Sequence, residues 1–143
     1  GFWVRDFRRA VDFAVSRPDL DSTRIAFYGF SWGGRTGPLL LALEPRVKAA
    51  VLYVAGFKLQ RSLPEADPFN YAPRVRIPVL MVNARHDYFF PIETSQLPLY
   101  QMLGSPADAK RHVVYDGGHT VPRAVLMREM QDWLDRWLGA TTP

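Results

Sequence analysis

The amino-acid sequence predicts an α/β protein of three layers, in which a mostly parallel sheet carries helices on both faces. Short apolar runs alternate along the chain with longer segments whose apolar residues recur at helical spacing, and this alternation is typical of parallel sheets covered by helices. Two runs, at residues 47–54 and 78–83, are apolar almost throughout, as expected for strands buried on both faces. Hydrophobic residues make up 48% of the 143-residue chain, which suits one packed core and predicts a single domain over residues 1–143.

The first half of the chain is expected to contain two helices and two strands. Helical spacing of apolar residues predicts a helix near residues 2–15, which ends before Pro18 because the residue preceding a proline avoids helical geometry. Residues 24–29 form a short apolar run and are expected to be a buried strand. A second helix is predicted to begin after Ser31 and to run to residue 43, with Pro38 tolerated in its early part. The strand at 47–54 follows.

The second half begins with an irregular segment, residues 57–76, in which three prolines break any regular pattern. A third strand is expected at 78–83 and a fourth at 112–115. Between them, residues 92–103 are expected to form a helix that is interrupted or bent near Pro98. The last predicted helix covers 123–138, has one apolar stripe, and ends at Gly139.

Composition argues against several classes of protein. The net charge is +4, but the basic residues are scattered, so we expect no nucleic-acid partner. No apolar run reaches the roughly 18 residues of a membrane span, and residues 1–6 lack the pattern of a secretory signal, so we expect a cytoplasmic protein without a membrane partner. With no cysteine and three dispersed histidines, no metal site is expected. The chain does not begin with Met, and we expect it to be a piece of a longer protein.

A candidate nucleophile lies directly after the first predicted strand. The motif Gly29-x-Ser31-x-Gly33 joins this strand to the second helix and is typical of a nucleophile elbow, in which a strained turn projects a serine from the sheet edge. We expect side chains at positions 29 and 33 to collide with neighbouring backbone, so that only small residues fit. The N–H of Trp32 would then face the oxyanion of a tetrahedral intermediate. The alternative is an ordinary turn with a solvent-facing serine.

Two further strand ends carry the partners that a serine nucleophile needs. Asp87 follows the third strand and His119 follows the fourth, and parallel sheets gather such residues at one edge. A serine hydroxyl needs a base within hydrogen-bond reach, and we predict that His119 is this base and that Asp87 orients its ring. Other assignments remain open. They are His86 as the base, and Asp116 or Glu93 as the acid. We expect His112, at the start of a strand, to lie on the surface.

Aromatic residues near these strand ends are candidates for binding the substrate. We predict that Phe30, Phe57 and Tyr88 contact it, and that Trp32, Phe89 and Phe90 also line an apolar cleft, although core packing explains such residues equally well. Arg35 is a candidate partner for a substrate carboxylate, or an ordinary surface residue of a helix. The remaining serines considered are expected to be ordinary polar positions: Ser62, Ser95 and Ser105.

At these residues the chain resembles the α/β-hydrolase superfamily, in particular its dienelactone hydrolase and prolyl-oligopeptidase-like branches. The similar segments are Arg17-Pro18-Asp19-Leu20-Asp21, Ile77-Pro78-Val79-Leu80 and Gly117-Gly118-His119. Three others are similar to hydrolase domains at the C-terminal end of bacterial serine/threonine protein kinase fusion proteins. They are Leu63 to Asn70, Phe89-Phe90-Pro91 and Trp133 to Gly139.

The resemblance implies the C-terminal part of the fold, without its upstream strands. In a complete fold the elbow follows the fifth strand and the second oxyanion donor comes from an upstream loop. The first strand would then present a bare edge at residues 25–28, and we expect it to pair in a homodimer or to pack against the missing upstream part.

The sequence therefore predicts a serine hydrolase that cleaves an ester, thioester or small amide through an acyl-serine intermediate. Its partner is a small acyl substrate, and no cofactor is required. The alternative is a non-catalytic, hydrolase-like binding or regulatory domain of a larger protein, which the absence of the upstream oxyanion segment favours.

Overall fold

A parallel sheet of four strands forms the centre of this computed structural model, which describes residues 2–140. The strands are β1 (Ala26–Phe30), β2 (Ala49–Tyr53), β3 (Val79–Ala84) and β4 (Lys110–Tyr115). They lie side by side in the order β1-β2-β3-β4, and each neighbouring pair is parallel. All four carboxyl ends therefore meet at one edge, which confirms the sheet that the apolar runs predict.

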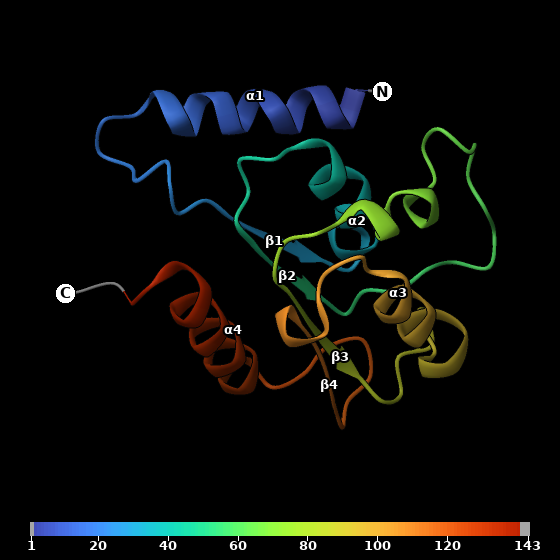
Figure 1. Cartoon of the computed structure of the whole chain (residues 1–143). Helices are drawn as coiled ribbons and strands as arrows, with labels where there is room; N and C mark the ends of the chain where they lie inside the picture. The colour runs from blue at the N-terminus through green and yellow to red at the C-terminus, as the bar shows by residue number, and fades with distance from the viewer. Residues whose placement is uncertain (1, 141–143) are drawn as a thin grey trace.

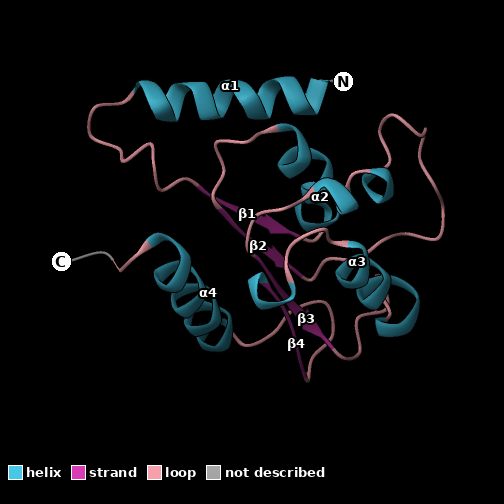
Figure 2. Cartoon of the chain, in the orientation of Figure 1, coloured by secondary structure: helices cyan, strands magenta, loops and turns pink. Residues whose placement is uncertain are grey.

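Helices cover both faces of the sheet, so the predicted three layers are confirmed. The helix α4 (Arg123–Leu138) lies on one face, and α2 (Trp32–Leu43) and α3 (Leu97–Met102) lie on the other, with α1 (Phe2–Ser16) packed outside α2 (Figure 1). Short 3₁₀ turns occupy Pro68–Asn70, Ala72–Arg74 and Ala107–Ala109. Figure 2 shows how loops join the strand ends to these helices.

One apolar core lies on each face of the sheet, because successive residues of a strand point to opposite faces. On β2, Ala50 and Leu52 join the core beneath α2 and α3. Val51 and Tyr53 join the core beneath α4, which is closed by Trp133. Every residue of β2 and β3 is buried, which explains why both strands are apolar almost throughout rather than alternating.

Two of the predicted helices contain a proline. The helix α2 has the predicted bounds, and Pro38, expected in its early part, is the seventh of its 12 residues, so the helix lacks one backbone hydrogen bond in its interior. Tight packing compensates, since Gly37 lies directly against the side chain of Leu52. Residues 92–103 form a π-helical turn, Ile92–Gln96, followed directly by α3, so the interruption expected near Pro98 is confirmed.

The strand β1 lies at an edge of the sheet, as predicted, and within residues 2–140 it pairs only with β2. Tyr28 and Phe30 are about half exposed on it. A hollow of about 570 Å³ lies at the amino end of this strand and is lined by α1, the loop after it and α4, with Leu20, Ile25 and Leu134 among its walls. The homodimer, or the upstream segment, expected to cover this edge stays a prediction.

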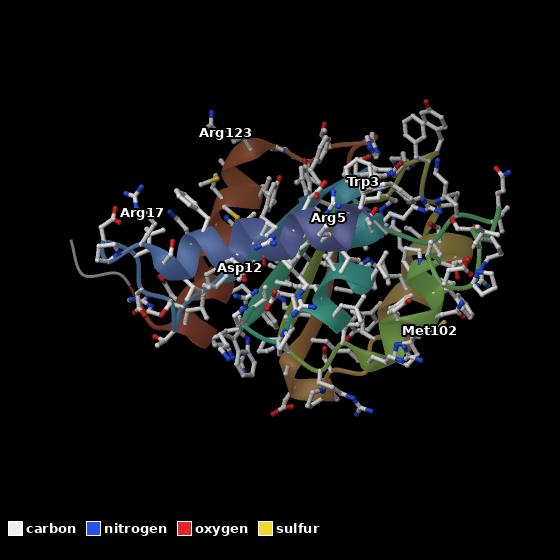
Figure 3. All side chains as sticks on the ribbon, turned by 90° about the horizontal axis from the view of Figure 1, so that it is seen from above. Trp3, Arg5, Asp12, Arg17, Met102 and Arg123 are labelled. Atoms are coloured by element: carbon white, nitrogen blue, oxygen red, sulfur yellow. The ribbon has the colours of Figure 1, made fainter. Side chains whose placement is uncertain are left out.

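The helix α1 lies across the outside of the molecule, and Figure 3, which looks down on it, places Trp3 and Arg17 towards opposite ends. The ring of Trp3 packs edge-on against Trp32 at 4.7 Å between centroids, so the start of α1 supports the start of α2. No helix between residues 2 and 140 is both long and apolar enough to cross a membrane.

Candidate active site

The turn between β1 and α2 holds Ser31 in a strained conformation. Its φ is 52° and its ψ is −106°, a region that residues with a side chain seldom adopt. Hydrogen bonds on both sides maintain it, because the Ser31 N–H donates to the carbonyl of Tyr53 at 2.9 Å and the Ser31 carbonyl accepts the N–H of Arg35 at 2.8 Å. Such strain persists only where the surroundings enforce it, and it collects at functional sites.

Two glycines make this turn possible, and only one of them is a glycine that the motif predicted. A Cβ at Gly29 would lie 2.6 Å from the carbonyl oxygen of Gly33, so the prediction for position 29 is confirmed. The prediction for Gly33 is wrong, because a Cβ there would meet nothing within 4 Å. The second crowded position is Gly34, where a Cβ would lie 2.7 Å from the Cβ of Ala55. Gly34, one residue after Gly33, is therefore the position of α2 that faces the end of β2.

Three side chains from separate strand ends form a continuous hydrogen-bonded chain. Nε2 of His119 lies 2.7 Å from the hydroxyl of Ser31, and Nδ1 of His119 lies 2.9 Å from Oδ2 of Asp87. With an ionised carboxylate at Nδ1, the ring donates from that nitrogen, which leaves Nε2 to accept the serine proton. The arrangement can therefore remove the proton of Ser31 and stabilise the imidazolium that results.

The carboxylate of Asp87 is held in place by the backbone that follows it. Its side chain is 0% exposed, and Oδ1 accepts the N–H groups of Phe89 at 2.9 Å and Phe90 at 3.3 Å. Both oxygens are thus occupied, as a buried charge requires. The ring of His119 is itself flanked by Phe89, edge-on at 4.8 Å between centroids. The loop after β3 therefore supplies both the acid and a wall of the site.

The alternative acids and base lie elsewhere. His86 is exposed, and its backbone N–H donates to the carbonyl of Gly117. Asp116 pairs with Arg85 at 3.1 Å on the surface, and Glu93 is exposed in the π-helical turn. Neighbours along a strand end point in different directions, so adjacency to Asp87 in the sequence does not bring His86 to Ser31.

A cavity of about 300 Å³ opens beside Ser31 and His119. Its remaining walls are apolar rings and two cations: Phe30, Trp32, Phe89, Phe90, Arg35 and Lys58. The structure thus places Phe30 at this cavity, whereas Phe57 and Tyr88 line a neighbouring hollow of about 240 Å³. The ring of Phe57 also belongs to the core, against Phe69.

Sequence reasoning missed a buried glutamine below the site. The side chain of Gln96 is fully buried, and its Nε2 donates to the carbonyls of Ala84 at 2.9 Å and Phe90 at 2.7 Å. These two carbonyls bracket the loop that carries Asp87, so Gln96 fixes the ends of that loop. Nothing in a single sequence distinguishes this glutamine from a solvated one, because only the π-helical turn directs it inward.

His112 was expected on the surface, but it is only partly exposed. The strand β4 begins two residues earlier than expected, at Lys110, so His112 lies inside the strand. Its Nε2 lies 3.3 Å from Oε1 of Gln96 and its ring faces Tyr100. Burial lowers the pKa of His112, because a low-dielectric environment disfavours the charged ring. Within residues 2–140 no group of three or more His, Asp or Glu side chains is placed to hold a metal ion.

The sequence matches known proteins over most of its length. The model of the family described as "Dienelactone hydrolase family" matches residues 3–120. A protein of Escherichia coli named for carboxymethylenebutenolidase activity is 30% identical over 106 residues, which are 73% of this chain and 39% of that protein. Cutinase 2 of Thermobifida cellulosilytica is 26% identical over 97% of this chain and 53% of its own length. The likeness to hydrolase domains of kinase-containing proteins stays a prediction.

Solved structures agree with the sequence comparison. A cold-adapted esterase from an Arctic intertidal metagenomic library superimposes with a TM-score of 0.78 at 25% identity, over 94% of this chain and 57% of the esterase. The acetyl xylan esterase of Paenibacillus sp. R4 gives 0.77 at 25% identity, over 94% and 52%. The chain thus spans about half the length of these relatives. It has the α/β-hydrolase fold and belongs to the dienelactone hydrolase family.

Proposed function

We propose that the chain hydrolyses esters through an acyl intermediate on Ser31. The observation that carries the proposal is the ring of His119, which bonds Ser31 through one nitrogen and Asp87 through the other. The hydroxyl oxygen of Ser31 attacks the substrate carbonyl while its proton passes to Nε2 of His119. The tetrahedral adduct then collapses, and the same proton leaves with the alcohol. Water, deprotonated by His119, releases the acid and restores the serine.

The start of α2 supports the charged intermediate of this reaction. Trp32 is the first residue of the helix, and the first N–H groups of a helix have no acceptor within it. The N–H of Trp32 adjoins the attacking oxygen and would donate to the oxyanion, where the positive end of the helix dipole adds to the stabilisation. Losing one such donor costs about 10²–10³ in rate, so this group is a substantial part of the proposed mechanism.

The cavity supports a small substrate with an apolar part and an anionic group. Its aromatic walls suit hydrocarbon, while Arg35 and Lys58 bring two positive charges to one space. Positive side chains at a cavity attract an anionic group of a ligand. Arg35 lies one turn after Ser31 on α2. Because helical side chains lean towards the N-terminus of their helix, the side chain of Arg35 extends towards Ser31 and lines the same cavity. The choice of an ester over an amide as the proposed substrate rests on a separate observation. The relatives named above are called esterases and cutinase.

A fluorophosphonate probe, which reacts with an activated serine, tests the proposal. Wild-type protein should be labelled, and Ser31→Ala should abolish labelling. Ser16→Ala, at the exposed end of α1, is the matched control and should leave labelling intact. Asp87→Asn keeps the geometry but favours the tautomer of His119 that is protonated on Nε2, which cannot accept the serine proton, so labelling should slow by roughly 10⁴. Absence of labelling in the full-length natural protein would defeat the proposal and favour a non-catalytic binding domain.

A further inference from the structure

Tyr53, the last residue of β2, hydrogen-bonds two of the segments that meet at the site. Its hydroxyl accepts the backbone N–H of Val121 at 2.7 Å and donates to the carbonyl of Val121 at 3.4 Å. Its own carbonyl accepts the N–H of Ser31 at 2.9 Å. Val121 lies two residues after His119, so one residue bonds both the nucleophile and the segment that carries the base.

The hydroxyl of Tyr53 has a function that packing alone would not require. Tyr53 is 5% exposed and Val121 is 7% exposed, so neither polar group can turn to solvent. Without this acceptor, the N–H of Val121 would be buried and unpaired, which is more costly than the loss of an exposed hydrogen bond. The other end of the His119 loop is fixed separately, where the carbonyl of Gly117 accepts the N–H of His86 at 2.9 Å. The hydroxyl thus closes the second end of a short loop.

The carbonyl of Tyr53 is aimed by strain in the next residue. Val54 has a φ of 43°, which a β-branched residue rarely adopts. Two hydrogen bonds to β3 hold Val54 in this conformation. The N–H of Val54 donates to the carbonyl of Val82 at 2.8 Å, and Nδ2 of Asn83 donates to the carbonyl of Ala55 at 2.8 Å. Such over-determined strain marks positions whose geometry matters to the site. The end of β2 is therefore rigid where it meets Ser31.

We propose that Tyr53 is a positioning residue that sets the distance between Ser31 and His119. It touches neither substrate nor reacting atoms and acts through the backbone on both sides. The inference rests on the proposed ester hydrolysis, because the distance it sets is the one across which the serine proton moves. Misplacing a catalytic group by about 1 Å can cost roughly 10²-fold in rate, so the loss of the hydroxyl should fall on turnover rather than on binding.

The test compares Tyr53→Phe with Val121→Ala in the full-length natural protein. Tyr53→Phe removes the hydroxyl and keeps the ring. Val121→Ala removes buried methyl groups from the same core but keeps the backbone N–H and carbonyl that Tyr53 binds. Both should destabilise the protein, and urea unfolding measures by how much. With para-nitrophenyl acetate, Tyr53→Phe should lower kcat by about 10–100-fold with KM little changed, whereas Val121→Ala should keep the wild-type kcat.

A second measurement reports directly on the environment of His119. Proton NMR should show a downfield signal from the Nδ1 proton that His119 shares with Asp87. This signal should broaden or shift in Tyr53→Phe and stay unchanged in Val121→Ala. Wild-type kcat in Tyr53→Phe, or an equal loss in both variants, would overturn the positioning role. A wild-type protein without turnover would instead defeat the proposed function, and the NMR comparison would still decide whether Tyr53 places His119.

Discussion

Replacing Gly29 by alanine tests how the turn at Ser31 is built. The new Cβ would lie 2.6 Å from the carbonyl oxygen of Gly33 and 2.7 Å from the ring of Phe27. An ordinary contact begins at 3.4 Å, so β1 and α2 must separate by roughly 0.8 Å, and overpacking of this kind costs about 1–3 kcal/mol. Because Ser31 lies between these two elements, it moves with them, and a shift near 1 Å costs up to about 10²-fold in rate.

The control variant is Gly33→Ala, since a Cβ there meets nothing within 4 Å. Urea unfolding and the rate of fluorophosphonate labelling measure the two effects. Gly29→Ala should lower the stability and slow labelling by about 10–100-fold, and Gly33→Ala should change neither by much. The usual reading of the motif, in which both glycines are required, predicts equal loss in the two variants. That equal loss, or wild-type labelling in Gly29→Ala, would refute the steric argument.

Three other perturbations have expected outcomes. Arg46→Gln should lower the stability at neutral pH, because it removes the guanidinium that lies 2.6 Å from the buried Glu44 and leaves Arg8, at 3.8 Å, as the nearest cation. The Arg46 hydrogen bond lowers the pKa of Glu44, so this difference should shrink in urea titrations as the pH falls below about 4.3. Burial lowers the pKa of His112, so folded protein should lose stability as the pH falls below about 6.5, and His112→Gln should remove that dependence. Changing Arg35 and Lys58 together to glutamine should lower kcat/KM about tenfold or more for a carboxylate-bearing ester, and leave that for its neutral analogue unchanged.

Helices and strands were predictable where their pattern was long and locally consistent. The final helix ends at Leu138, with Gly139 at a φ of 82°, as its stop signal predicts. Errors arose where packing overrides local preference. Pro38 lies later in α2 than expected, as one of the buried residues of that helix, and His112 is half-buried because β4 starts earlier than its apolar residues indicate. Neither position carries a local signal of the tertiary contact that decides it.

The sequence alone determined the parallel sheet and the three strand ends that bear Ser31, Asp87 and His119. Apolar runs and turn residues are local patterns, and parallel strands bring their carboxyl ends together without further information. Tertiary structure decided which glycine is crowded, that Gln96 and Tyr53 fix the loops of Asp87 and His119, and that Lys58 shares a cavity with Arg35. These features depend on backbone groups and side chains far apart in the chain, whose separations of a few ångströms are set only when the layers pack.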